Sequence, residues 1–70
     1  MAFTKTEKHL VIGLKLFGLT EENQRAIFLA LQTEKQQRTL VDYMMEHLSA
    51  SEQDILKETV RILKATEEPL

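Results

Sequence analysis

Apolar residues recur along this chain with a period close to 3.6 residues, the repeat of an α-helix, and most clearly near the C-terminus. One stripe at helical spacing carries Ile55, Leu56, Thr59, Val60, Ile62 and Leu63. Asp54 and the charged residues that follow it lie on the opposite side. Ser51 stands at the N-cap position, with Asp54 in the place of the capping-box acid. The pattern predicts a helix over residues 52–65 that buries one face.

The stretch before it is also amphipathic and predicts a helix over residues 34–48. Its apolar stripe contains Leu40, Val41, Met44, Met45 and Leu48. Methionine side chains repack easily, so Tyr43, Met44 and Met45 with Phe28 are able to line an adaptable groove, but we expect these residues in the core. Only residues 49–51 separate this helix from the next one. Such a short connection predicts that the two helices are antiparallel neighbours.

Residues 21–32 form a third helical window, which begins after a capping threonine, Thr20. Its apolar face holds Ala26, Ile27, Ala30 and Leu31, with Phe28 beside them. Eight consecutive polar residues then follow. A helix through them would bury nothing for two turns, so we place a break at Thr33, which forms a second capping box with Gln36. A single bent helix over 21–48 is the alternative.

The first window, residues 5–17, is apolar on two sides. One stripe contains Leu10, Val11, Leu14 and Phe17, and a second stripe on the far side contains Ile12, Leu16 and Leu19. The run also alternates like a β-strand, but no other window offers a partner strand. We therefore expect a helix that ends at Gly18 as its C′ residue. Gly13 lies inside this helix at a cost of about 1 kcal/mol relative to alanine.

Composition agrees with an all-α fold. The 70 residues include eleven leucines but only two glycines and one proline. We predict one domain over residues 1–70, a compact bundle of three to four short helices with frayed ends at 1–4 and 66–70. The expected helices cover residues 5–17, 21–32, 34–48 and 52–65. A chain of this size buries only roughly 60% of its unfolded surface, so a lone core is marginal.

Composition and charge also exclude several classes of protein. The absence of cysteine removes disulfides and thiolate chemistry. The longest apolar stretch, from Leu10 to Leu19, is ten residues and too short to span a membrane. The net charge of −2 argues against bulk attraction to nucleic acid or anionic lipid. Glu7 and the lack of a small-residue cleavage site indicate an unprocessed protein, which we expect in the cytoplasm.

Candidate chemistry is sparse. His9 and His47 lie in different windows without a second ligand at helical spacing, so we expect no metal. His47 suits the last turn of its helix, where a positive charge is favourable. Asp42 and Glu46 form a like-charged pair that we interpret as solvated surface. The two serines are explained as helix caps, and no glycine loop for phosphate occurs. We expect no enzyme activity, cofactor or small-molecule substrate.

The two-sided first helix is the strongest indication of function. A helix turns only one stripe toward its own bundle, and we assign Leu10, Leu14 and Phe17 to that stripe. The residues left as an outward, partner-binding patch are Ile12, Leu16 and Leu19. We expect a small protein-interaction module, either a homodimer through this patch or an adaptor or regulatory subunit of a larger protein.

A small helix-turn-helix DNA-binding protein is the alternative. After a turn at Thr33, the next helix begins with Lys35, Gln36, Gln37, Arg38 and Thr39. Base-reading side chains lie at this end of a recognition helix, where glutamine and arginine pair with adenine and guanine. Against this function, residues 34–48 carry a net charge of −1, and no basic stripe is present to hold phosphates. We therefore expect these residues to be solvated polar positions.

Overall fold

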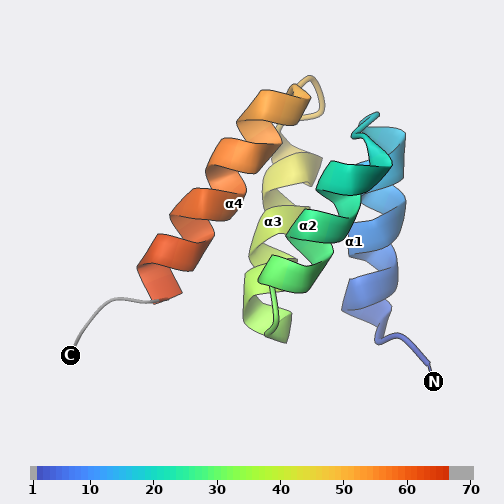
Figure 1. The fold of residues 1–70 in the computed structure, drawn as a ribbon, viewed down its shortest axis with the longest axis vertical. Helices are drawn as coiled ribbons and strands as arrows, with labels where there is room; N and C mark the ends of the chain where they lie inside the picture. Colours follow the sequence, from blue (N-terminus) through green and yellow to red (C-terminus); the bar gives the residue numbers. More distant parts are fainter. Residues whose placement is uncertain (1, 67–70) are drawn as a thin grey trace.

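Four α-helices run alternately up and down through the molecule, joined by short loops (Figure 1). The structure, a computed structural model, describes residues 2–66. The helices are α1 (Lys5–Leu16), α2 (Glu21–Ala30), α3 (Glu34–Glu46) and α4 (Glu52–Thr66). No strand occurs in this described part of the chain. The all-α prediction is confirmed, and each helix ends within two residues of its predicted range.

The break between α2 and α3 lies at Thr33, so the alternative of one bent helix is wrong. Thr33 is the N-cap of α3, and its hydroxyl accepts the Gln36 N–H at 3.1 Å. The Gln36 side-chain oxygen in turn accepts the N–H groups of Gln32 and Thr33 at 2.9 and 3.1 Å. These bonds satisfy the backbone groups that a continuous helix would have paired internally.

The start of α1 is held by a second capping box. The Thr4 hydroxyl accepts the Glu7 N–H at 3.1 Å, and the Thr4 N–H donates to the Glu7 carboxylate at 2.8 Å. The Phe3 ring lies against Phe28 of α2, with centroids 5.6 Å apart. Phe3 and Thr4, two of the positions predicted to fray, therefore have contacts with the first two helices. The other predicted frayed positions include residues 1 and 67–70, which lie outside the described residues.

Gly18 ends α1 and turns the chain toward α2. Its φ of 81° lies in the left-handed region, as expected for a C′ glycine. The Gly18 N–H donates to the Lys15 carbonyl at 3.0 Å and the Leu19 N–H to the Leu14 carbonyl at 3.2 Å, the two bonds of a Schellman motif. This turn takes Leu19 off the helical path and into the core. The prediction that Leu19 faces outward is wrong for that reason.

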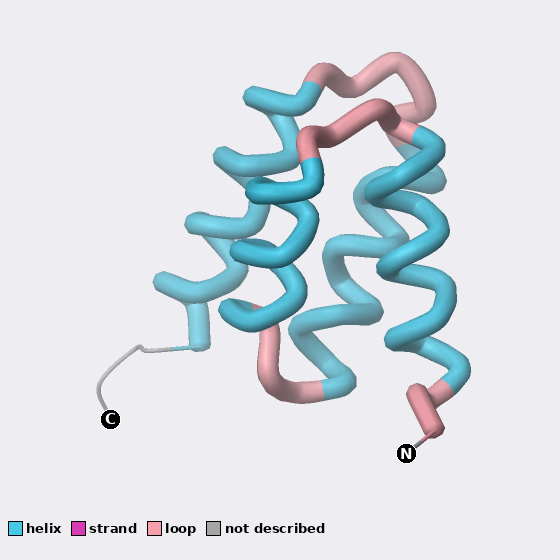
Figure 2. Tube along the Cα trace, turned by 45° about the vertical axis from the view of Figure 1, so that its right-hand side comes forward, coloured by secondary structure: helices cyan, strands magenta, loops and turns pink. Residues whose placement is uncertain are grey.

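α1 and α3 are neighbours that run in the same direction (Figures 1 and 2). Near their N-terminal ends the Thr6 hydroxyl donates to the Glu34 carboxylate at 3.0 Å, and further along Gly13 faces the tip of Met44. α2 packs beside α1, and α4 packs beside both α3 and α2. α2 and α3 therefore lie across a diagonal of the bundle. α3 and α4 are the antiparallel neighbours that their short connection predicts.

The core fills the centre of these four helices. Its buried apolar members are Leu10, Leu14, Leu19, Ile27, Leu31, Leu40, Met44, Ile55 and Ile62. The predicted stripe of α3 divides in the structure, because Leu40 and Met44 are buried while Met45 and Leu48 are exposed. The expectation that Met45 lies in the core is therefore wrong. None of the helices within residues 2–66 has both the length and the apolarity to cross a membrane.

α4 begins with the Ser51 and Asp54 box that its sequence predicts. The Ser51 N–H donates to Asp54 at 3.1 Å, and the Asp54 N–H donates to the Ser51 hydroxyl at 3.2 Å. Hydrogen bonds from the backbone and the hydroxyl of Ser51 lower the pKa of Asp54. Figure 1 shows α4 leaning away from the other helices toward its C-terminal end. Val60, predicted on the buried stripe, is half exposed.

Candidate interaction surface

An apolar groove of about 380 Å³ runs along the outer side of the α1 and α3 pair. Four exposed side chains flank it: Ile12 and Leu16 from α1, Met45 from α3 and Leu48 just beyond it. Their exposed fractions are 54% for Ile12, 80% for Leu16, 67% for Met45 and 73% for Leu48. These four residues and the groove between them are called the α1–α3 surface below. It joins residues that are more than thirty positions apart in the sequence.

Gly13 lies in the floor of the groove, opposite the tip of the Met44 side chain. A Cβ atom at this position would lie 2.9 Å from the Met44 Cε atom, closer than carbon atoms normally come. Met44 is itself buried beneath the groove, and half-buried Val41 lies beside it. The Met44 tip thus occupies the space next to a glycine in the middle of a helix, where glycine costs about 1 kcal/mol relative to alanine.

The structure brings together only part of the predicted patch. Ile12 and Leu16 are exposed on one side of α1 as expected, whereas Leu19 belongs to the core. Met45 of α3 and Leu48 just beyond α3 take its place beside the groove. A signal for Met45 was present, because at helical spacing it lies roughly 140° around the helix from Leu40, further than one buried face extends.

The two flanks of the α1–α3 surface carry opposite charges. Lys8 and Lys15 stand one turn before and one turn after Ile12, on the side of α1 that is turned away from α3. On α3, Asp42 precedes Met45 by three residues, and Glu46 follows Asp42 by four. All four charged residues are exposed.

The N-terminal end of the surface is polar and internally paired. Glu34 and Arg38 form an exposed ion pair at 3.8 Å. The buried Thr6 connects this pair to α1, since its hydroxyl donates to the Glu34 carboxylate at 3.0 Å and accepts a hydrogen bond from Arg38 Nη2 at 3.5 Å. A smaller hollow of about 260 Å³ begins here and shares His9 and Val41 with the apolar groove. The apolar contact area is thus closed at one end by hydrogen-bonded polar groups.

The residues of the DNA-binding alternative do not form a common surface. Gln36 and Gln37 are both buried, Gln36 in the capping box and Gln37 through a 2.8 Å bond from its Nε2 to the Leu31 carbonyl. Neither side chain is available to read a base edge, so their assignment as base-reading or solvated residues is wrong. Lys35 and Arg38 are exposed, and Arg38 is engaged with Glu34.

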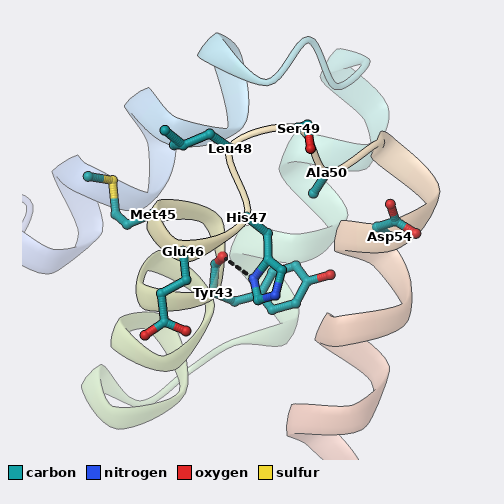
Figure 3. A pocket seen from close by; sticks show the side chains of 8 residues that line it. All are labelled: Tyr43, Met45, Glu46, His47, Leu48, Ser49, Ala50 and Asp54. Carbon is teal, nitrogen blue, oxygen red and sulfur yellow. Dashed lines mark hydrogen bonds between the residues drawn. The ribbon is translucent and has the colours of Figure 1, made fainter.

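The corner between α3 and α4 holds a second hollow, of about 500 Å³ (Figure 3). His47 is the C-cap of α3, close to its predicted place. Its ring lies on Tyr43 with centroids 4.3 Å apart, and Nδ1 is 3.0 Å from the Tyr43 carbonyl oxygen. Met45 and Leu48 point away from these rings toward α1 (Figure 3). The corner hollow thus adjoins the apolar groove, and Met45 and Leu48 line both.

Metal-binding chemistry is not assembled anywhere in the part of the chain that the structure describes. No group of three histidine, cysteine or acidic side chains there is placed to hold an ion. Comparison with known proteins adds no further candidate residue. No family model, curated protein or solved structure matches this chain.

Proposed function

We propose that this protein is a non-enzymatic interaction module that binds a second copy of itself through the α1–α3 surface. The observation that carries the proposal is the continuity of that surface, in which four exposed apolar side chains, from α1, α3 and the loop after α3, surround one apolar groove. Isolated exposed leucines are common on proteins, whereas a contiguous apolar patch marks a contact site. We place the protein in the cytoplasm in this proposal, the compartment expected from the sequence.

The energetics of this surface suit a reversible contact. Burying one aliphatic side chain completely stabilises by roughly 1.5–3 kcal/mol, so covering these four partly exposed ones contributes on the order of 4–8 kcal/mol per copy. Association itself costs about 4–15 kcal/mol. The apolar gain from two copies and the cost of association are of similar size. The apolar contact is therefore necessary for association, and the polar surroundings decide its strength.

The size of the molecule is compatible with such a contact. A standard interface buries ~800 Å² on each partner. The chain exposes 5315 Å², so an interface of that size covers about 15% of its surface. A two-fold dimer, the commonest closed assembly, brings identical patches together and leaves neither one open to water.

The test is the oligomeric state of two matched leucine variants. We expect the unmodified protein to sediment as a dimer at about 100 μM, which requires a dissociation constant well below that concentration. Leu16→Lys places a charge in the apolar surface and should give a monomer of unchanged helicity by circular dichroism. Leu29→Lys changes another exposed leucine, which lies on α2 outside the groove and is 63% exposed, and this variant should remain a dimer.

Two outcomes contradict the proposal. A monomer of the unmodified protein at this concentration rules out self-association. The α1–α3 surface would then be the binding site for a helix of another protein, which is the adaptor function. Equal loss of mass in both leucine variants shows that association does not depend on the α1–α3 surface. If Leu16→Lys loses helicity, the smaller change Leu16→Ser repeats the measurement at the same position.

A further inference from the structure

We infer that the two copies pair about a two-fold axis parallel to α1 and α3, so that α1 of each copy packs on α3 of the other. The inference rests on the proposed self-association and adds the arrangement of the partner. It follows from the direction of the two helices, their alignment and the charges on their flanks.

α1 and α3 run in the same direction. Thr6 bonds both Glu34 and Arg38, which lie one turn apart on α3, and Gly13 faces the tip of Met44 further along. Lys15 and Glu46 each follow the Gly13 and Met44 contact by two residues, so they lie at about the same level.

A dimer that joins two identical pairs of parallel helices face to face has two simple settings of its two-fold axis. An axis parallel to the helices stacks α1 of one copy on α3 of the other, with all four helices pointing the same way and residue levels preserved. An axis perpendicular to the helices stacks α1 on α1 and α3 on α3, each pair antiparallel.

The flank of α1 beside Ile12 carries Lys8 and Lys15, and the flank of α3 beside Met45 carries Asp42 and Glu46. The parallel axis brings the lysine flank of each copy beside the acidic flank of the other, with Lys15 level with Glu46. The perpendicular axis opposes lysines to lysines and acids to acids. Opposed like charges weaken an interface and opposite charges stabilise it, so the parallel axis is favoured.

The resulting assembly also accounts for the apolar groove. In the parallel setting, α1 and α3 of both copies form a four-helix arrangement whose shared core is the two α1–α3 surfaces. The groove above Gly13 leaves space between the exposed side chains on its two sides, and the side chains of the other copy fill this space. The charged flanks lie at the rim, where their pairing selects the arrangement.

Charge reversal distinguishes the two settings. We expect Lys8→Glu with Lys15→Glu to weaken dimerisation about tenfold or more at low salt, and Asp42→Lys with Glu46→Lys to do the same, measured by sedimentation equilibrium. All four changes in one chain should restore a dissociation constant within about threefold of the unmodified value. Lys57→Glu with Lys64→Glu on α4 makes the same change in net charge and should have no such effect.

The perpendicular setting gives a different pattern. In that setting each flank faces the same flank of the other copy, so charge reversal replaces one like-charged pair by another. All three variants should then keep a dissociation constant close to that of the unmodified protein. This result overturns the inference. The inference then fails while the proposed dimer stands. A monomeric unmodified protein, by contrast, overturns both.

Cross-linking provides a second measurement, because the chain has no cysteine of its own. A mixture of Lys15→Cys and Glu46→Cys proteins should join into a mixed dimer with a short bis-maleimide linker, whereas Lys15→Cys alone should not. Efficient cross-linking of Lys15→Cys to itself supports the perpendicular setting and contradicts the inference.

Discussion

Gly13 and Gly18 meet different physical demands within the same short segment. Gly18 adopts a left-handed conformation with open space around it, so glycine is favoured at this position by the backbone conformation alone. Gly13 has an ordinary helical backbone conformation, and a side chain at this position would crowd the tip of Met44 that faces it. Substituting each by alanine separates backbone strain from crowding.

We predict that Gly18→Ala destabilises the protein by about 1–2 kcal/mol, the cost of a left-handed L-residue. Gly13→Ala gains about 1 kcal/mol of helix propensity but must displace the flexible end of Met44, so its net change should be within ~1 kcal/mol of zero. Urea unfolding of both variants measures the difference. A Gly13→Ala loss equal to that of Gly18→Ala contradicts the assignment of crowding to a movable side chain.

Glu52 ties the start of α4 to the start of α2. Its Oε2 atom accepts bonds from Asn23 Nδ2 at 2.6 Å, the Thr20 N–H at 3.1 Å and the Thr20 hydroxyl at 3.4 Å. The Asn23 bond, followed by those from Thr20, lowers the pKa of Glu52 below its ordinary value. A carboxyl with a lowered folded-state pKa stabilises the fold above its unfolded pKa of about 4.3, and loses this effect as the pH falls through the folded value.

We therefore predict that the midpoint of thermal unfolding falls on acidification below about pH 4.3, and that Glu52→Gln makes this fall smaller. Glu52→Gln should also lower the midpoint at pH 7, because the carboxylate bonds are lost. Glu21→Gln, an exposed residue at the start of α2, serves as the control for loss of one charge. If both variants show the same pH dependence, the tie does not depend on the Glu52 charge.

At the scale of elements, the junction between α2 and α3 is stabilised by buried polar side chains of a type that is normally exposed. Gln37 is buried and donates to the Leu31 carbonyl, the C-cap of α2. Gln36 closes the capping box at the same junction. The two glutamines connect the end of one helix to the beginning of the next.

We predict that Gln37→Ala destabilises the protein by about 1–3 kcal/mol, since it leaves a buried carbonyl without its partner. The neighbouring exposed Lys35→Ala should change stability by less than about 0.5 kcal/mol. Denaturant unfolding gives both values. A DNA-reading function predicts instead that Gln37→Ala keeps its stability and loses binding to a duplex.

For the whole molecule, stability and association are linked. A chain of this size has a marginal core by itself, and a partner that covers an exposed apolar surface stabilises the folded state through mass action. α1 and α3 supply that surface, while α4 leans away from the bundle at its free end (Figure 1).

We predict that the midpoint of thermal unfolding rises with protein concentration, measured by calorimetry over roughly a hundredfold range. Leu16→Lys should remove this dependence, and Leu29→Lys should keep it. A midpoint that does not change with concentration in the unmodified protein contradicts a stabilising dimer.

The helices and their ends were determined by the sequence alone, because the forces involved act over a few residues. Thr33 with Gln36 and Ser51 with Asp54 form capping boxes through bonds three residues apart, and the left-handed Gly18 ends α1. Helical periodicity correctly placed Leu10, Leu14 and Ile55 inside.

The candidate surface was decided by tertiary structure, because exposure depends on which helix lies alongside. Periodicity shows that Met45 and Leu48 are on an apolar side of α3, but only the position of α1 decides that both remain uncovered. The same is true of Leu19, which the turn at Gly18 carries into the core. The periodicity of apolar residues determines only which side of its own helix a residue is on. The packing of α1 beside α3, more than thirty residues away in sequence, determines whether water or another helix is found there.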